Sequence, residues 1–170
     1  MPVPPHHPLD PELIRFLTGG RSLNLAAADG EGRPSQCRAL GCRIDGAGAR
    51  VTVFFSRRQG ADLLRDAARN GALAAVFSDP PTHRTLQLKG SDARPEPLAP
   101  GDADRVAAYR AAFVQVLLPL GFKEPLIRAL LDCPDQDLVA LAFTPEAVFN
   151  QTPGAQAGAP LAPPVPRGAP

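Results

Sequence analysis

The sequence lacks tryptophan, has a single tyrosine and contains only three cysteines, Cys37, Cys42 and Cys133. An odd number of cysteines without close spacing does not suit a disulfide framework, so we expect reduced thiols and a cytoplasmic protein. No basic segment followed by an apolar stretch lies near Met1, so we expect no secretion signal. No uncharged apolar run is long enough to span a bilayer, which predicts no association with a membrane.

A charge excess of one sign is also missing. The chain has 18 basic and 17 acidic residues, and its formal net charge is +1. It therefore has no long-range field that would attract nucleic acid or an anionic membrane surface. Only two of the basic residues are lysines, and this bias, together with abundant alanine, glycine and proline, is typical of a GC-rich bacterial genome.

The composition changes at both ends of the chain. Residues 1–8 are rich in proline and histidine, and residues 153–170 consist almost entirely of proline, alanine and glycine. Such segments bury too little apolar surface to offset the entropy of ordering them. We therefore predict one folded domain over 9–152, with a disordered N-terminus over 1–8 and a disordered tail over 153–170.

Turn residues divide this domain into short elements. Asp10 followed by proline predicts the start of a first helix, a second short helix is expected over 61–69, and a helical insertion over about 101–131. Glycine-rich turns at 29–32 and 45–48 indicate hairpins. We expect six strands, over 22–28, 36–44, 50–55, 72–77, 84–89 and 138–143. Six hairpin-linked strands favour a mainly β fold, an antiparallel barrel with flanking helices.

Few residues in this domain suit metal or nucleophilic chemistry. Cys37 and Cys42 lie five residues apart and face opposite sides of a strand, so they do not form a chelate. His83 is the only histidine within 9–152. A single histidine in a turn is more often an ordinary turn residue than a metal ligand. Two adjacent arginines, Arg57 and Arg58, precede a short helix, where an anion site and a solvated turn both explain them.

Three strings, in their order and spacing, resemble the pyridoxamine 5′-phosphate oxidase-like family. They are 22–43, with its Asp-Gly-x-Gly-Arg-Pro turn, 51–77, and 82–90. The resemblance covers 11–90 and again 138–154. It implies an FMN-binding split barrel, here a six-stranded antiparallel split β-barrel, and a homodimer in which both subunits contact each flavin.

The resemblance also implies the cofactor-binding residues. Arg38, Arg57 and Arg58 are expected at the phosphate, and Arg43 occupies the last, basic position of the strand motif that begins at Arg38. The chain departs from the family pattern because the second helix begins without a lysine and because a glutamine is replaced by Thr85. The remaining expected contacts lie along the flavin ring and its edge: Leu40, Phe55, Ser56, Thr85 and Gln87.

The function implied by this resemblance is that of an FMN-dependent oxidoreductase acting on an unidentified small-molecule substrate. No catalytic residue is identified, and Tyr109 and His83 are the only candidate proton donors. Three alternatives stay open: a non-catalytic barrel that holds flavin or another anionic ligand as a sensor or store, a haem-binding barrel with His83 as axial ligand, and a vestigial barrel that acts through dimer or partner contacts.

Overall fold

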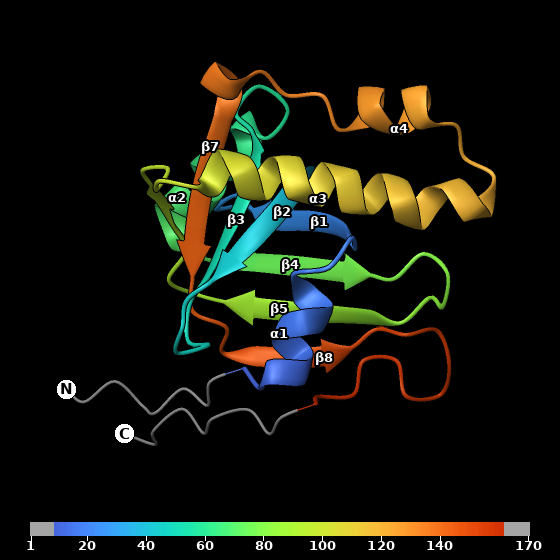
Figure 1. Ribbon diagram of the computed structural model, residues 1–170. Helices are drawn as coiled ribbons and strands as arrows, with labels where there is room; N and C mark the ends of the chain where they lie inside the picture. Colours follow the sequence, from blue (N-terminus) through green and yellow to red (C-terminus); the bar gives the residue numbers. More distant parts are fainter. Residues whose placement is uncertain (1–8, 162–170) are drawn as a thin grey trace.

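The computed structural model describes residues 9–161, which form an antiparallel sheet accompanied by helices (Figure 1). The strands are β1 (Ser22–Ala28), β2 (Pro34–Ile44), β3 (Val51–Ser56), β4 (Leu73–Ser78), β5 (Thr85–Gly90), β6 (Arg94–Glu96), β7 (Leu138–Phe143) and β8 (Ala147–Asn150). The helical elements are α1 (Pro11–Leu17), α2 (Ala61–Asn70), α3 (Asp102–Leu117), η1 (Leu118–Leu120), α4 (Glu124–Leu130) and η2 (Asp135–Asp137).

The sheet closes into a barrel through two bent strands. Its strand order is β6-β7-β3-β2-β1-β4-β5-β8. The pairing of Lys89 with Ala147, in β5 and β8, continues without a register shift to the pairing of Arg94 with Ala142, in β6 and β7. The segments β5–β6 and β7–β8 are therefore two long strands that bend together and pair on both sides of the bend.

Because of this bend, the number of strands differs from the predicted number. The sequence predicted six strands, whereas the structure has eight, because β6 and β8 are additional short segments. Neither has a clear strand signal: β6 has three residues and contains Pro95. The two short strands pair because the register between the two long strands continues past the bend, so that β8 pairs with β5 and β6 pairs with β7. The prediction of a mainly β, antiparallel split barrel is confirmed.

Two apolar cores lie on opposite sides of the barrel wall. The interior is filled by alternate residues of the strands and closed by α1, whose Phe16 and Leu17 are buried with it. A second core lies outside, where α3 crosses the barrel wall (Figure 1). The helix approaches β2 closely at Gly41, which has a φ of 103° and where a Cβ would lie 2.9 Å from the Cβ of Tyr109.

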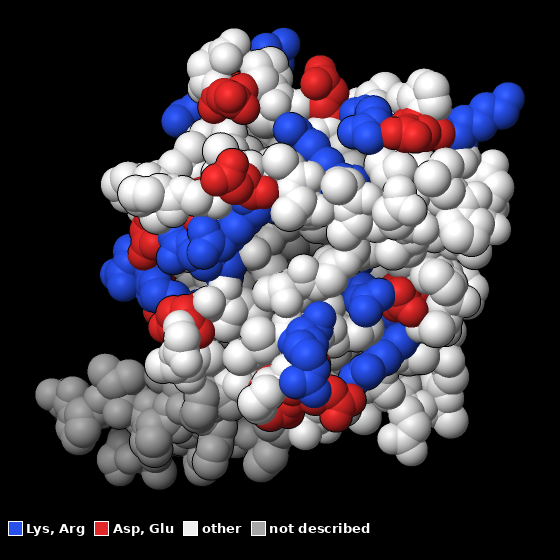
Figure 2. Space-filling model, in the orientation of Figure 1, with Lys and Arg blue, Asp and Glu red and all other residues white. Residues whose placement is uncertain are grey.

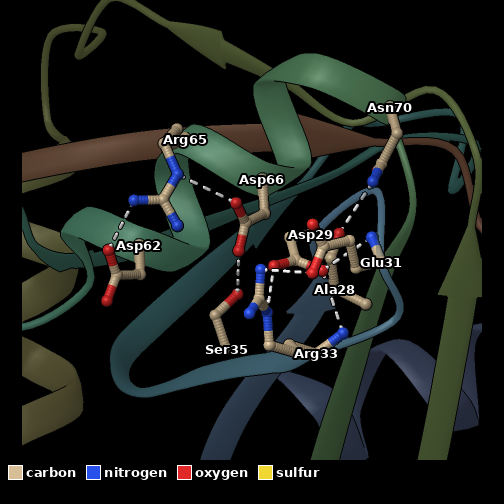
Figure 3. A network of polar contacts seen from close by, with 9 residues as sticks. All are labelled: Ala28, Asp29, Glu31, Arg33, Ser35, Asp62, Arg65, Asp66 and Asn70. Atoms are coloured by element: carbon tan, nitrogen blue, oxygen red, sulfur yellow. Dashed lines mark hydrogen bonds and ion pairs between the residues drawn. The ribbon is translucent and has the colours of Figure 1, made fainter.

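A polar network fastens α2 to the hairpin between β1 and β2 (Figure 3). The buried carboxylate of Asp66 accepts from Ser35 Oγ at 2.8 Å and from Arg65 Nε at 3.0 Å. At the end of the helix, Asn70 donates to the carbonyl of Ala28 at 2.8 Å. These contacts satisfy a buried charge and fix the helix over the hairpin, so we assign them a structural role.

The described structure extends past the predicted domain end at 152. Leu161 N–H donates to the Val148 carbonyl at 2.8 Å, and Pro160 forms a bridge with Phe149. Residues 158–161 therefore add to the β8 edge, while residues 162–170 of the predicted tail and the predicted N-terminal segment 1–8 lie outside the described residues. Within the described range, no helix is long and apolar enough to cross a membrane.

Candidate functional site

A cavity of about 630 Å³ lies where the β4–β5 hairpin meets the helical cover. Strands supply a polar floor, and the end of α3 and the segments after it supply an apolar wall. Its volume is within the range of small-molecule sites. Its lining residues include Ser22, Arg38, Ser78, His83, Thr85, Phe113, Leu117, Leu120, Phe122 and Leu130.

Arg38 is the cation of this cavity. It lies on the outer side of β2, opposite Asn24 of β1, and its guanidinium donates to Ser22 Oγ at 3.2 Å. Its Cζ lies 5.8 Å from the centre of the Phe113 ring. Within residues 9–161 no carboxylate pairs with Arg38. Its remaining donors can therefore bind an anionic group in the cavity.

The hairpin adds hydroxyl groups to the floor. Ser78 Oγ and Thr85 Oγ1 lie 2.9 Å apart, and Thr85 Oγ1 donates to the His83 carbonyl at 3.0 Å. His83 has a φ of 61°, a left-handed backbone that is uncommon for a residue with a side chain. Asp79 also lines this cavity, and its carboxylate accepts from Arg21 and from Thr82 Oγ1.

The predicted phosphate turn lies elsewhere and is occupied by the chain itself. Ser56 Oγ donates to the Asp137 carboxylate, and the N–H of Arg58 donates to it at 3.1 Å. The pKa of Asp137 is lower than its usual value, chiefly because the carboxylate accepts the Ser56 hydrogen bond. The N–H of Arg58 and the positive charges of Arg58 and Arg57 lower this pKa further. Arg57 and Arg58 are exposed, and neither lines the Arg38 cavity.

The remaining four predicted residues lie in four separate places. Leu40 is buried beneath α3 and Phe55 inside the barrel, so neither side chain lines the cavity. Gln87 accepts from Gln151 Nε2 at 3.2 Å on the outer side of the sheet. Arg43 donates to the buried carboxylate of Asp102. Of the nine predicted cofactor contacts, the structure brings Arg38 and Thr85 together in this cavity.

Arg43 lines a second cavity, of about 570 Å³, between the end of α1, β2 and α3. Figure 2 shows a hollow on this face, with basic side chains gathered at one side of it. Tyr109 also lines this second cavity, but burial raises the pKa of its hydroxyl, which donates to the Arg21 carbonyl at 2.7 Å. Tyr109 is therefore poorly placed to donate a proton in the Arg38 cavity, whereas His83 lines it.

Exposed apolar side chains gather in the segment that forms one wall of the Arg38 cavity. Five of the seven exposed large apolar residues in the described structure lie between 118 and 130. We refer to these five as the apolar rim. A cluster of this kind marks an interaction surface more often than scattered single residues do. The apolar rim consists of Leu118, Leu120, Phe122, Leu126 and Leu130.

Within the described residues, no group of three or more His, Cys, Asp or Glu side chains is placed to hold a metal ion. All three cysteines are free thiols. Desolvation by burial raises the pKa of Cys37 to about 12, so its thiol is neutral at physiological pH. The cavity chemistry therefore depends on Arg38, the hydroxyl groups and His83.

The sheet and its two bent strands form an antiparallel split barrel. No family model and no curated protein matches the chain. A solved structure of a HupZ variant from Group A Streptococcus is similar, with a TM-score of 0.50 and 14% identity, over 83% of this chain and 98% of that one. At this identity the likeness shows the fold.

Two further solved structures have similar coverage. One is HutZ from Vibrio cholerae, described as a heme storage protein, with 18% identity, a TM-score of 0.47, and coverage of 85% of this chain and 95% of that chain. The other, from Nostoc punctiforme, is described as a pyridoxamine 5′-phosphate oxidase-related, FMN binding protein. It has 15% identity, a TM-score of 0.48, and coverage of 88% of this chain and 89% of that chain.

Proposed function

We propose that this protein binds a flavin, FMN, in the Arg38 cavity and serves as an oxidoreductase for a small molecule. The observation that best supports this proposal is that the Arg38 guanidinium has no carboxylate partner among the described residues and lies against the Phe113 ring. A partly buried cation beside an apolar wall suits a ligand with a ring at one end and an anion at the other.

The cavity residues fit FMN in three respects. Arg38 supplies charge-assisted donors for a phosphate, Phe113 and Leu117 supply apolar surface for a ring, and Ser78 and Thr85 supply hydroxyls for its polar edge. The Ser56 turn does not fit, because Asp137 fills it. Bound flavin would supply hydride or electron transfer.

The residues of this chain would bind and orient the ligand and its substrate. The end of α3 excludes water from one side of the cavity, and the hydroxyls restrain the ligand edge on the other. His83 is the imidazole among the residues that line this cavity, and an imidazole can accept and donate a proton. We assign His83 as the candidate proton donor.

A second copy of the chain is the proposed partner. The apolar rim lies in the segment that forms one wall of the cavity, and three of its residues, Leu120, Phe122 and Leu130, line it. A homodimer formed there would bury the rim and close the cavity at the same time. The three free thiols suit the cytoplasmic location that the sequence predicts.

The test is a titration of the purified protein with FMN and, separately, with riboflavin, followed by desalting and an absorption spectrum. Arg38→Ala should weaken FMN binding about ten- to hundredfold, which corresponds to roughly 1.5–3 kcal/mol for a charge-assisted contact. Riboflavin, which lacks the phosphate, should bind both proteins alike. The control is Arg69→Ala, an exposed arginine of α2 outside this cavity.

Failure of the wild-type protein to retain flavin, or equal FMN affinity in the Arg38→Ala variant, contradicts this assignment. Retained flavin with no turnover by reduced nicotinamide or oxygen would instead favour the non-catalytic binding protein. Haem is the second candidate, because His83 lines the same cavity. Haem binding predicts a Soret band that is lost in His83→Ala, and a flavin-type spectrum contradicts it.

A further inference from the structure

The turn from Ser56 to Gly60 has no backbone donor left for a ligand. The N–H of Arg57 donates to the Asp137 carbonyl at 2.7 Å, and the N–H of Arg58 donates to the Asp137 carboxylate at 3.1 Å. The N–H of Gln59 donates to Ser56 Oγ at 3.2 Å, and that of Gly60 to the Ser56 carbonyl at 2.9 Å. An oxyanion at this turn would therefore find no free backbone N–H group and would depend on the two guanidinium groups.

The carboxylate of Asp137 supplies the negative charge at this turn. It accepts from Ser56 Oγ and lies near the guanidinium groups of Arg57 and Arg58. Within residues 9–161 no ion pair joins the guanidinium group of either arginine to a carboxylate, and the contact of Arg58 with Asp137 is made by its backbone N–H. The turn therefore has the donors expected of an anion site, and its anion belongs to the same chain.

The position of Asp137 is fixed by the sheet. Ser56 of β3 pairs with Leu138 of β7, so residue 137 must lie opposite residue 57. The hydrogen bond from Arg57 N–H extends that pairing by one residue. Moving Asp137 away would require opening the end of the β3–β7 pair, and the carboxylate is therefore a fixed part of the barrel.

We infer that the Ser56–Gly60 turn is closed to ligand phosphate because Asp137 of the same chain occupies the place of the bound anion. The phosphate contacts that the resemblance implies for Arg57 and Arg58 are thus replaced at this turn by an internal contact, which also uses Ser56, the residue expected at the flavin edge. This inference does not depend on flavin binding at Arg38, because it concerns a separate turn and its own hydrogen bonds.

The experiment uses inorganic phosphate as the probe and calorimetric titration at pH 7.5 as the measurement. Wild-type protein and Arg58→Ala should bind phosphate equally weakly, within about twofold. Asp137→Ala should bind it at least about tenfold more tightly, as expected for a regained charge-assisted contact. Adding Arg58→Ala to that variant should remove the gain.

Asp135→Ala is the matched control, since Asp135 lies on the same short helix η2 and makes no contact with the turn. Circular dichroism and thermal unfolding establish that each variant is folded. A folded Asp137→Ala protein that binds phosphate no better than Asp135→Ala overturns the inference, as does wild-type binding that depends on Arg58. If Asp137→Ala fails to fold, Asp137→Asn removes only the charge and should still tighten phosphate binding severalfold. An Asp137→Asn protein whose affinity for phosphate equals that of the wild type also overturns the inference.

Discussion

Arg43 Nε donates at 3.0 Å to a carboxylate oxygen of Asp102, whose side chain is fully buried. The second carboxylate oxygen accepts from the N–H of Ala99 at 2.8 Å. One side chain thus connects β2 to the first turn of α3, the helix that forms one wall of both cavities. The pair fixes where the helical cover starts on the barrel.

We expect Asp102→Asn to destabilise the protein by about 1–3 kcal/mol, because an amide cannot accept from both neighbours and leaves Arg43 without its counter-charge. Urea unfolding at pH 7 measures this change. Asp104→Asn, at an exposed position in the same turn, is the control and should change stability by less than about 0.5 kcal/mol. Equal effects of the two substitutions would show that the buried pair contributes nothing specific.

A substitution at Gly41 tests how closely α3 packs on β2. Its φ of 103° opposes any side chain, and a Cβ at this position would lie only 2.9 Å from the Cβ of Tyr109. Gly41→Ala should therefore cost about 2–4 kcal/mol and lower the melting temperature. Gly30→Ala, where a Cβ meets nothing within 4 Å, should be nearly neutral. A Gly41→Ala protein as stable as Gly30→Ala would contradict the close packing of α3 on β2.

Local signals in the sequence predicted much of the fold. Asp10 caps α1 as predicted, and its carboxylate accepts from the N–H of Leu13 at 2.8 Å. The strands with clear turns at both ends were also found. The short segments β6 and β8 were missed because they pair through a register inherited from β5 and β7. Leu161, in the predicted tail, pairs with β8 for the same long-range reason.

The candidate site was less predictable, because it depends on which side of the barrel wall each residue faces. Arg38 and Thr85 share the cavity, but Leu40 and Phe55 are separated by the wall between two cores. The hydrogen-bond partner of Ser56 is Asp137, which lies 81 residues further along the chain. No local sequence pattern connects residues so far apart. Only the pairing of β3 with β7 brings these two residues together.

The apolar rim predicts the oligomeric state. If a second copy covers it, the protein should behave as a dimer of the 17.9 kDa chain in light scattering. Leu126→Glu places a charge at the most exposed rim position, 64% exposed, and should produce a monomer of unchanged fold. Leu98→Glu, at an exposed leucine outside the rim, should remain dimeric. A monomeric wild-type protein, or a dimer that tolerates Leu126→Glu, would contradict the proposed interface.

Acid should weaken the corner at which the barrel closes. Asp92 lies between β5 and β6, and its carboxylate accepts from the N–H and hydroxyl of Thr144 at 2.7 and 2.8 Å. Partial burial acts to raise the pKa of Asp92, but the two Thr144 hydrogen bonds and the charge of Arg50 outweigh it and leave that pKa lowered. The carboxylate thus joins the two bent strands next to the bend.

Because the pKa of Asp92 is lower in the folded than in the unfolded protein, its ionisation stabilises the fold above the unfolded value of about 3.9. That contribution is lost as the pH falls below about 4 and through the folded pKa. We expect Asp92→Asn to be less stable than wild type by about 1 kcal/mol or less at pH 7, because the side chain is 39% exposed and solvent screens its charge, and the difference to shrink between pH 5 and 3. Urea unfolding across this range measures it, with Asp104→Asn as the control. A difference that stays constant with pH would mean that the Asp92 charge does not hold the corner.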